Sequence, residues 1–424
     1  MDLFEQIGME FPCRKNAFMG FPVFIAFISA VLFGQVFISV FSSAFELDNR
    51  YCMLIFRGCL AAYSLYIVLN SLRTSQKLSS NIFVFSLLSF WAYYFSRLLW
   101  DFWIVGINLK IPLWEFFAWG LGSCLLPALA GFILSKQRFH QDTAFIFSWI
   151  GLLLLGIASV GFFANGDHES SRFALQNLNP INASHAFFAL SLFGFSSLLW
   201  SARNAFSQLL SLLALTFGFT MGIYAGSRGA FLSFLIAIFI IFFLFAKECQ
   251  AKKKIVMPSF LALLSFIISV IVFNAGFSFR LLRSGIDQNS SMRLFAIRES
   301  FDNFWLHPWA GSGFELHNNL EGSSFQLFNG AVIWYPHNFI AEAMGLGGII
   351  LIISFLACLW FAFNASLSVA KDRNSESWRL ALLIQGLGFC MFSGHLSNVP
   401  MFWVCLGIAA SSSEVFLDKS SSDA

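Results

Sequence analysis

The chain has 424 residues, of which 58% are hydrophobic and only 11% are charged, and its formal net charge is +3. Soluble globular domains carry about 25% charged residues, so this composition excludes an ordinary soluble protein. The eight cysteines are scattered, which indicates neither a disulfide framework nor a Cys-rich metal site. We also expect no cofactor and no nucleic-acid partner.

Apolar runs long enough to cross a bilayer recur along the chain. About 20 apolar residues span the hydrocarbon core, and there the backbone must form its hydrogen bonds within a helix. We predict an all-α, polytopic integral membrane bundle of about twelve transmembrane helices, forming one domain over residues 1–424. The candidate segments are 18–42, 51–72, 80–104, 111–134, 143–164, 181–200, 204–226, 229–246, 255–275, 337–363, 379–396 and 398–412.

The first segment and the last two segments each allow a second interpretation. The first segment is too long for a cleavable signal peptide and lacks a clear small-residue cleavage site, so we interpret it as a retained helix. The last two segments are short and separated by a polar kink near Asn398 and Pro400, so about eleven helices are an alternative. No internal repeat of the kind found in transporters is visible.

The distribution of Lys and Arg predicts the topology. Cations are in excess in one set of loops, which the positive-inside rule assigns to the cytoplasm, and the run Lys252–Lys254 marks one of them. Lysine predominates in the inner loops and arginine in the outer loops. The planar guanidinium matches phosphate oxygens better than an ammonium does, although chance in a small sample also explains the bias.

One connection is long, and residues 276–336 form a predicted periplasmic loop. Its aromatic and apolar content is too high for disorder. Residues 292–305 carry apolar side chains near helical spacing, which predicts a short amphipathic helix lying on the outer membrane face. These apolar residues are Leu294, Ile297, Phe301 and Phe304.

The first candidate anion site is Ser227-Arg228, where one predicted segment ends outside and the next begins. A helix start exposes unpaired N–H groups and the positive end of the helix dipole. An arginine at that place favours binding of an anion. The alternative is an interfacial arginine that extends to the lipid headgroups.

Arg293 begins the predicted surface helix of the large loop. That helix is followed by Pro308 and by Gly311 and Gly313, and such residues end a helix and let the backbone pass close to a ligand. A solvated charge on a loop helix is the alternative for Arg293.

His337 and Asn338 close the large loop and open a predicted transmembrane segment. An imidazole with a pKa near the ambient pH can take a proton from an attacking hydroxyl. We place His337 on the same helical face as Ala341, Met344 and Gly348, which leaves a mostly small surface below it. A structural histidine that is hydrogen-bonded to backbone is the alternative.

Two further groups have rival interpretations. Asp167 and Glu169 lie in a smaller outer loop and could hold a divalent cation, although a solvated loop explains them better. Arg97 and Asp101 are one helical turn apart, and we expect them to neutralise each other near the outer end of their segment.

These motifs resemble those of the O-antigen ligases and related polysaccharide polymerases of bacterial inner membranes. The resemblance rests on Ser227-Arg228-Gly229, on Arg293 followed by Pro308, Gly311 and Gly313, and on His337-Asn338 followed by Gly348. Arg172, in the smaller outer loop, fits less specifically. Ile297 and Leu346 depart from the family pattern, where Trp and an acidic residue are common, and this bears on the acceptor.

The resemblance implies a metal-independent glycosyltransferase of the inner membrane, with its active site facing the periplasm. The donor would be a glycan linked to undecaprenyl diphosphate in the membrane lipid. Arg228 and Arg293 would bind the diphosphate, and His337 would be catalytic. Arg172, Ser227, Asn338, Gly311 and Gly313 would support the site.

We favour a ligase that transfers finished O-antigen to a hydroxyl of lipid A–core, because only one outer loop is large. An O-antigen or exopolysaccharide polymerase, with a growing glycan as acceptor, and a protein O-oligosaccharyltransferase are alternatives within the family. A polysaccharide transporter or flippase is the alternative outside it, and that class predicts pseudo-symmetric halves.

Overall fold

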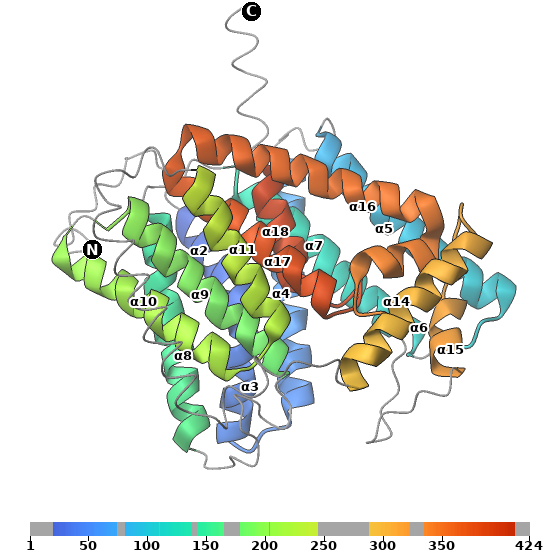
Figure 1. Ribbon diagram of the computed structural model, residues 1–424, viewed down its shortest axis with the longest axis horizontal. Helices are drawn as coiled ribbons and strands as arrows, with labels where there is room; N and C mark the ends of the chain where they lie inside the picture. Colours follow the sequence, from blue (N-terminus) through green and yellow to red (C-terminus); the bar gives the residue numbers. More distant parts are fainter. Residues whose placement is uncertain are drawn as a thin grey trace, which may run out of the picture.

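The computed structural model describes residues 20–73, 81–109, 111–136, 142–164, 179–202, 204–244, 288–322 and 335–411 (Figure 1). Within these ranges all regular structure is helical. The predicted class, a polytopic helical membrane protein, is therefore confirmed.

The helices of the first half of the chain are long and apolar, and several contain a π-helical stretch. They are α2 (Gly20–Ser29), which continues through η1 (Ala30–Gly34) into α3 (Gln35–Ala44); α4 (Asn49–Arg73); α5 (Ile82–Trp100) with η2 (Asp101–Val105); α6 (Leu113–Phe117), which continues through η3 (Ala118–Leu125) into α7 (Leu126–Leu134); α8 (Thr143–Ala164); α9 (Pro180–Trp200); and α10 (Ala205–Tyr224).

The second half adds the helices that surround the candidate site. They are α11 (Arg228–Leu244), α14 (Gln288–Leu306), α15 (Glu315–Gly322), α16 (Phe339–Asp372), the 3-10 turn η4 (Asn374–Glu376), α17 (Trp378–Phe392) and α18 (Pro400–Ala410). Figure 1 shows α14 and α15 at one end of the molecule, beside the start of α16.

Eight helical stretches in the described part of the chain are long and apolar enough to cross a membrane. Two shorter apolar helices, Arg228–Phe242 and Pro400–Ala410, match further predicted segments. The predicted segment 255–275 lies outside the described residues, so the count of about twelve stays a prediction. The polar break near Asn398 does separate two helices, α17 and α18.

Helix α9 lies at the centre of the bundle and α4 at its edge. In the most apolar stretch of α9, 89% of the residues are buried, against 17% in α4. Close packing of α9 on α10 depends on small residues, since a Cβ atom at Gly194 would lie 2.6 Å from the backbone nitrogen of Leu215. Ser191 Oγ donates to Leu215 O across the same contact, over 3.0 Å.

Helix α16 is interrupted at Gly348, whose φ of 60° and ψ of −150° are not helical. The segment 308–313 lies against this break and exchanges backbone hydrogen bonds with it. The left-handed φ explains a glycine at position 348. The donor–acceptor pairs are Ser312 N to Gly345 O, Gly313 N to Leu346 O and Ile349 N to Pro308 O, at 2.8, 3.1 and 2.8 Å.

An ion pair between Arg97 and Asp101 anchors the same segment from the other side. Arg97 Nε lies 3.0 Å from Asp101 Oδ1, which confirms the predicted pairing. Arg97 also donates to Ala310 O over 3.1 Å, and Asp101 Oδ2 accepts from Phe314 N–H over 2.8 Å. The pair therefore connects α5 to the loop that joins α14 and α15.

Replacing Asp101 with alanine should destabilise the protein strongly. Asp101 is fully buried, so its loss leaves Arg97 with an uncompensated charge, at a cost of about 3–5 kcal/mol. The matched control is Asp302→Ala, because the Asp302–Arg298 pair is exposed at both ends and such pairs contribute about 0–1 kcal/mol. Thermal unfolding in detergent measures both variants, and equal shifts would contradict this role for Asp101.

Helix α14 confirms the predicted helix of the large loop and has two unlike faces. Met292, Ala296 and Ser300 are buried against the protein. Leu294 and Phe301 remain 56% and 38% exposed. An exposed apolar stripe fits the predicted contact of this helix with a membrane surface.

Candidate functional site

The last residues of α17 are the point at which the three predicted motifs meet. Arg293, which lies in α14, donates to Phe392 O over 2.8 Å. Asn338 Nδ2 donates to Met391 O over 3.2 Å. Gly229 of α11 packs on Phe392, where an added Cβ would lie 2.5 Å from the Phe392 Cβ. Segments that are more than 50 residues from Met391 and Phe392 in the chain thus converge on one helix end.

The C-terminus of α17 holds Arg293 by a charge-assisted hydrogen bond. The last carbonyls of a helix have no partner within the helix and carry partial negative charge. The guanidinium has five N–H donors, and one of them binds Phe392 O. Arg293 lies in the second turn of α14, one turn later than its predicted place at the helix start.

Arg228 lies at the first turn of α11, as predicted. Ser227 Oγ accepts from Ala230 N–H over 3.3 Å, which is the bond expected of an N-cap serine. The Arg228 side chain is exposed. It therefore combines an accessible guanidinium with the positive end of a helix dipole.

Asn338 fixes the start of α16, and His337 directly precedes it. Asn338 Oδ1 accepts from Ala341 N–H over 3.0 Å as the N-cap. His337 has a φ of 55°, in the left-handed region that costs an L-residue roughly 1–2 kcal/mol. Its ring lies beside the Tyr335 ring, with centroids 4.1 Å apart.

The placement of His337 corrects one expectation from the sequence. We placed it on the same helical face as Ala341, Met344 and Gly348, but α16 begins only at Phe339. Because Asn338 caps the helix in extended conformation, the imidazole is not stacked above that face. Gly348 serves the break in α16 instead.

The environment of His337 keeps the imidazole neutral. Burial, and then the positive charge of Arg293, lower the pKa of His337 from its ordinary value to about 3. The pKa is thus below the value near the ambient pH that suits a general base, because the side chain is buried. Tyr335 stays protonated as well, since burial raises the pKa of its phenol to about 12.

Gly311 and Gly313 pack against protein atoms. Both have positive φ, 66° and 69°. A Cβ at Gly311 would lie 2.5 Å from the carbonyl carbon of Leu346, and one at Gly313 would overlap the Asp101 carboxylate. The close approach expected of these glycines is therefore to α16 and to the Arg97–Asp101 pair. They shape the loop after α14.

Three predicted residues cannot be placed. Arg172, and the alternative cation ligands Asp167 and Glu169, lie outside the described residues.

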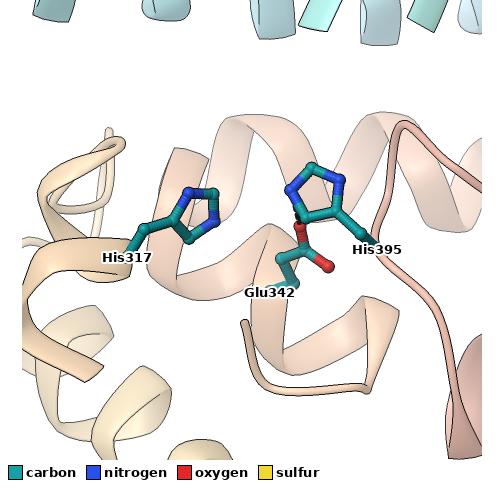
Figure 2. Close-up of side chains that lie close together, drawn as sticks. All are labelled: His317, Glu342 and His395. Carbon is teal, nitrogen blue, oxygen red and sulfur yellow. Dashed lines mark ion pairs between the residues drawn. The ribbon is translucent and has the colours of Figure 1, made fainter. Parts of the chain in front are cut away.

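The structure adds a polar cluster that we did not predict. His317, Glu342 and His395 are buried together (Figure 2). The Tyr335 and His395 rings are 5.4 Å apart, so the cluster adjoins His337. The available signal was Glu342, an ionisable residue in the first turn of an apolar helix, a position that usually indicates function.

The comparison with protein families agrees with the motifs. Residues 210–356 match the family model Wzy_C, described as O-antigen ligase. The match contains Arg228, Arg293 and His337, and it confirms the resemblance stated from the sequence. It supports a function of the O-antigen ligase or polymerase type on lipid-linked glycans. No curated protein matches the chain.

Proposed function

Because residues 210–356 match the O-antigen ligase family, we propose that the protein transfers a glycan from undecaprenyl diphosphate to a hydroxyl of lipid A–core. Transfer takes place at the periplasmic face of the inner membrane. The observation that carries this proposal is the convergence of Arg293, His337-Asn338 and the start of α11 on Met391 and Phe392.

In this proposal the acceptor oxygen attacks the anomeric carbon of the donor sugar. The bond from that carbon to the phosphate oxygen breaks, and the lipid diphosphate leaves with its electron pair. Arg228 and Arg293 stabilise the charge that develops on the diphosphate. Two guanidinium groups can supply this stabilisation without a metal ion or a nucleotide.

His337 takes the proton that the acceptor hydroxyl loses. A neutral imidazole can accept it through Nδ1, which is buried and makes no hydrogen bond within the described part of the protein. The low pKa of His337 makes the imidazole a weak base. A bound diphosphate opposes the charge of Arg293 and raises the pKa of His337, so the base becomes stronger when the donor is in place.

The pH dependence should therefore differ between the free and the loaded enzyme. In kcat/KM, which reports the free enzyme, protonation of His337 should produce no fall between about pH 8 and pH 5. In kcat, which reports the complex, the acid limb should lie at a higher pH. A limb near pH 6.5 in kcat/KM that disappears in His337→Gln would contradict this account.

The same pKa shift affects stability. The pKa of His337 is lower in the folded protein than in the unfolded chain, so the free energy of unfolding should decrease as the pH falls from about 6.5 toward 3.

The periplasmic placement can be tested by cysteine labelling. Trp309 is 73% exposed in the loop after α14, and Asp372 is exposed at the far end of α16. With the native cysteines replaced, Trp309→Cys should react with a membrane-impermeant thiol reagent in intact spheroplasts. Asp372→Cys should react only after lysis. The reverse pattern would place the site in the cytoplasm.

The acceptor separates the ligase from its alternatives. Purified protein in proteoliposomes receives a radiolabelled lipid-linked glycan, with lipid A–core or with a second lipid-linked repeat as acceptor. We expect label on lipid A–core. Lengthening of the lipid-linked glycan would identify a polymerase, and label on an added acceptor protein would identify an oligosaccharyltransferase.

A further inference from the structure

Three potential metal ligands from separate parts of the chain meet in the interior beside the candidate site. His317 comes from α15, Glu342 from the first turn of α16 and His395 from the loop between α17 and α18 (Figure 2). One ligand atom from each lies within 4.8 Å of the others. Their relative exposures are 2%, 0% and 2%.

The carboxylate and one imidazole already have a spacing that suits a shared ion. Glu342 Oε1 lies 3.1 Å from His395 Nε2, but Oε1 is not in hydrogen-bond geometry with any group in the described part of the chain. Zinc bonds of about 2.0–2.1 Å in a tetrahedron place neighbouring ligand atoms about 3.3 Å apart. The ligand atoms lie within 4.8 Å of one another, so the widest spacing must close by up to about 1.5 Å to complete that arrangement.

Neighbouring groups hold the ligands in place. Glu342 Oε2 accepts from Leu396 N–H over 3.1 Å, which leaves Oε1 directed at His395. The His317 ring packs on two aromatic rings, at centroid distances of 6.4 Å to Phe116 and 5.4 Å to Phe314. A hydrogen bond to a ligating carboxylate, such as the one from Leu396 N–H, is usual around a bound metal.

His395 has a partner for either tautomer of its ring. A metal on Nε2 requires the proton to be on Nδ1, and Ser397 Oγ lies 2.8 Å from Nδ1 and can accept it. The Ser397 backbone N–H lies 3.2 Å from the same Nδ1 and favours the other tautomer when no metal is bound. Metal binding therefore requires a proton to move between ring nitrogens but no rearrangement of the backbone.

The electrostatics of the cluster favour a cation. An ionised carboxylate that is fully buried is costly unless a positive charge is close. Glu342 has two imidazoles beside it, and a nitrogen, nitrogen and oxygen donor set is the one that zinc and similar divalent ions bind in proteins. Calcium and magnesium prefer ligand sets made of oxygen atoms.

We propose that His317, Glu342 and His395 bind one divalent transition-metal ion of the zinc class, with a water molecule as fourth ligand. The ion ties α15, the start of α16 and the loop after α17 together beside Tyr335 and His337. Three protein ligands and one water form an open zinc site, but we assign the ion a structural role because all three ligands are buried. The site is separate from the proposed transfer chemistry.

The first test is the metal content of the purified full-length protein, after growth with zinc and removal of loosely bound metal by a brief wash with chelator. We expect about one zinc per chain in the wild type. His307→Ala is the matched control, because His307 is an exposed histidine in the same region, and it should retain the ion. His317→Ala and Glu342→Gln should each lose it.

The second test needs no variant and so does not depend on whether the variants fold. X-ray absorption at the zinc edge of the wild type should show two imidazoles and one or two oxygen ligands at about 2.0–2.2 Å. A wild-type protein that remains metal-free after incubation with zinc would overturn the proposal, and so would an ion with sulfur ligands. The cluster would then be a hydrogen-bonded group only.

The outcome is distinguishable from that of the proposed function. His337→Ala should keep the metal while it loses transfer, because His337 is not one of the three ligands. A wild-type protein that binds no zinc on incubation and still transfers glycan would refute the metal site and leave the transfer proposal intact.

Discussion

Replacing His337 with alanine should lower the rate of glycan transfer by roughly 10²-fold or more, while abundance and membrane insertion stay unchanged. Loss of a general base typically costs about 10²–10⁴ in rate. The side chain lies outside α16, whose cap is Asn338, so its removal leaves the helix start in place. The measurement is the initial rate of transfer in proteoliposomes at matched protein density.

Two further substitutions separate catalysis from structure. His337→Gly removes the same imidazole and also relieves the left-handed backbone at φ 55°. It should be more stable than His337→Ala by roughly 1 kcal/mol and equally inactive. His307→Ala changes an exposed histidine and should transfer at the wild-type rate. A His337→Ala protein with full activity would reduce His337 to a structural residue.

Lysine at Arg293 should lower transfer by roughly 10²-fold, the scale for removing one donor that stabilises a developing anion. The substitution keeps the charge but loses the planar fork that binds two phosphate oxygens. Arg293 also donates to Phe392 O. The lysine ammonium has fewer N–H donors than the guanidinium, and it would have to serve both this carbonyl and the phosphate. Arg228→Lys should act in the same direction, since Arg228 belongs to the same proposed diphosphate site.

Arg298→Lys is the matched control on α14. Its side chain is 81% exposed and pairs with Asp302 over 3.7 Å, so it should keep wild-type activity. If Arg293→Lys and Arg298→Lys behave alike, Arg293 is ordinary surface charge. The rival scheme with a cation on Asp167 and Glu169 instead requires transfer to stop in chelator and to return with added magnesium.

Local patterns in the sequence predicted the features that depend on neighbouring residues. The apolar segments, the start of α11 at Arg228 and the surface helix now seen as α14 all follow from hydropathy, spacing and capping residues. The Arg97–Asp101 pair was predictable for the same reason, because one turn of helix separates the two side chains.

Contacts between distant segments were beyond such reasoning. The left-handed backbone of His337, with a φ of 55°, has no signal in the residues around it. Gly311 and Gly313 carry a general signal for close approach, but the partner, α16, lies more than 30 residues away. His395 and Glu342 come together only because the loop after α17 folds back on the start of α16.

The most direct test of the central claim is the stoichiometry of transfer in proteoliposomes that contain only the purified protein, a lipid-linked glycan and lipid A–core. We expect one undecaprenyl diphosphate to be released for each glycan attached to lipid A–core, in wild type and not in His337→Ala. Glycan transfer without release of the lipid diphosphate, or no transfer by the wild type, would contradict the assignment of Arg228, Arg293 and His337 to this reaction.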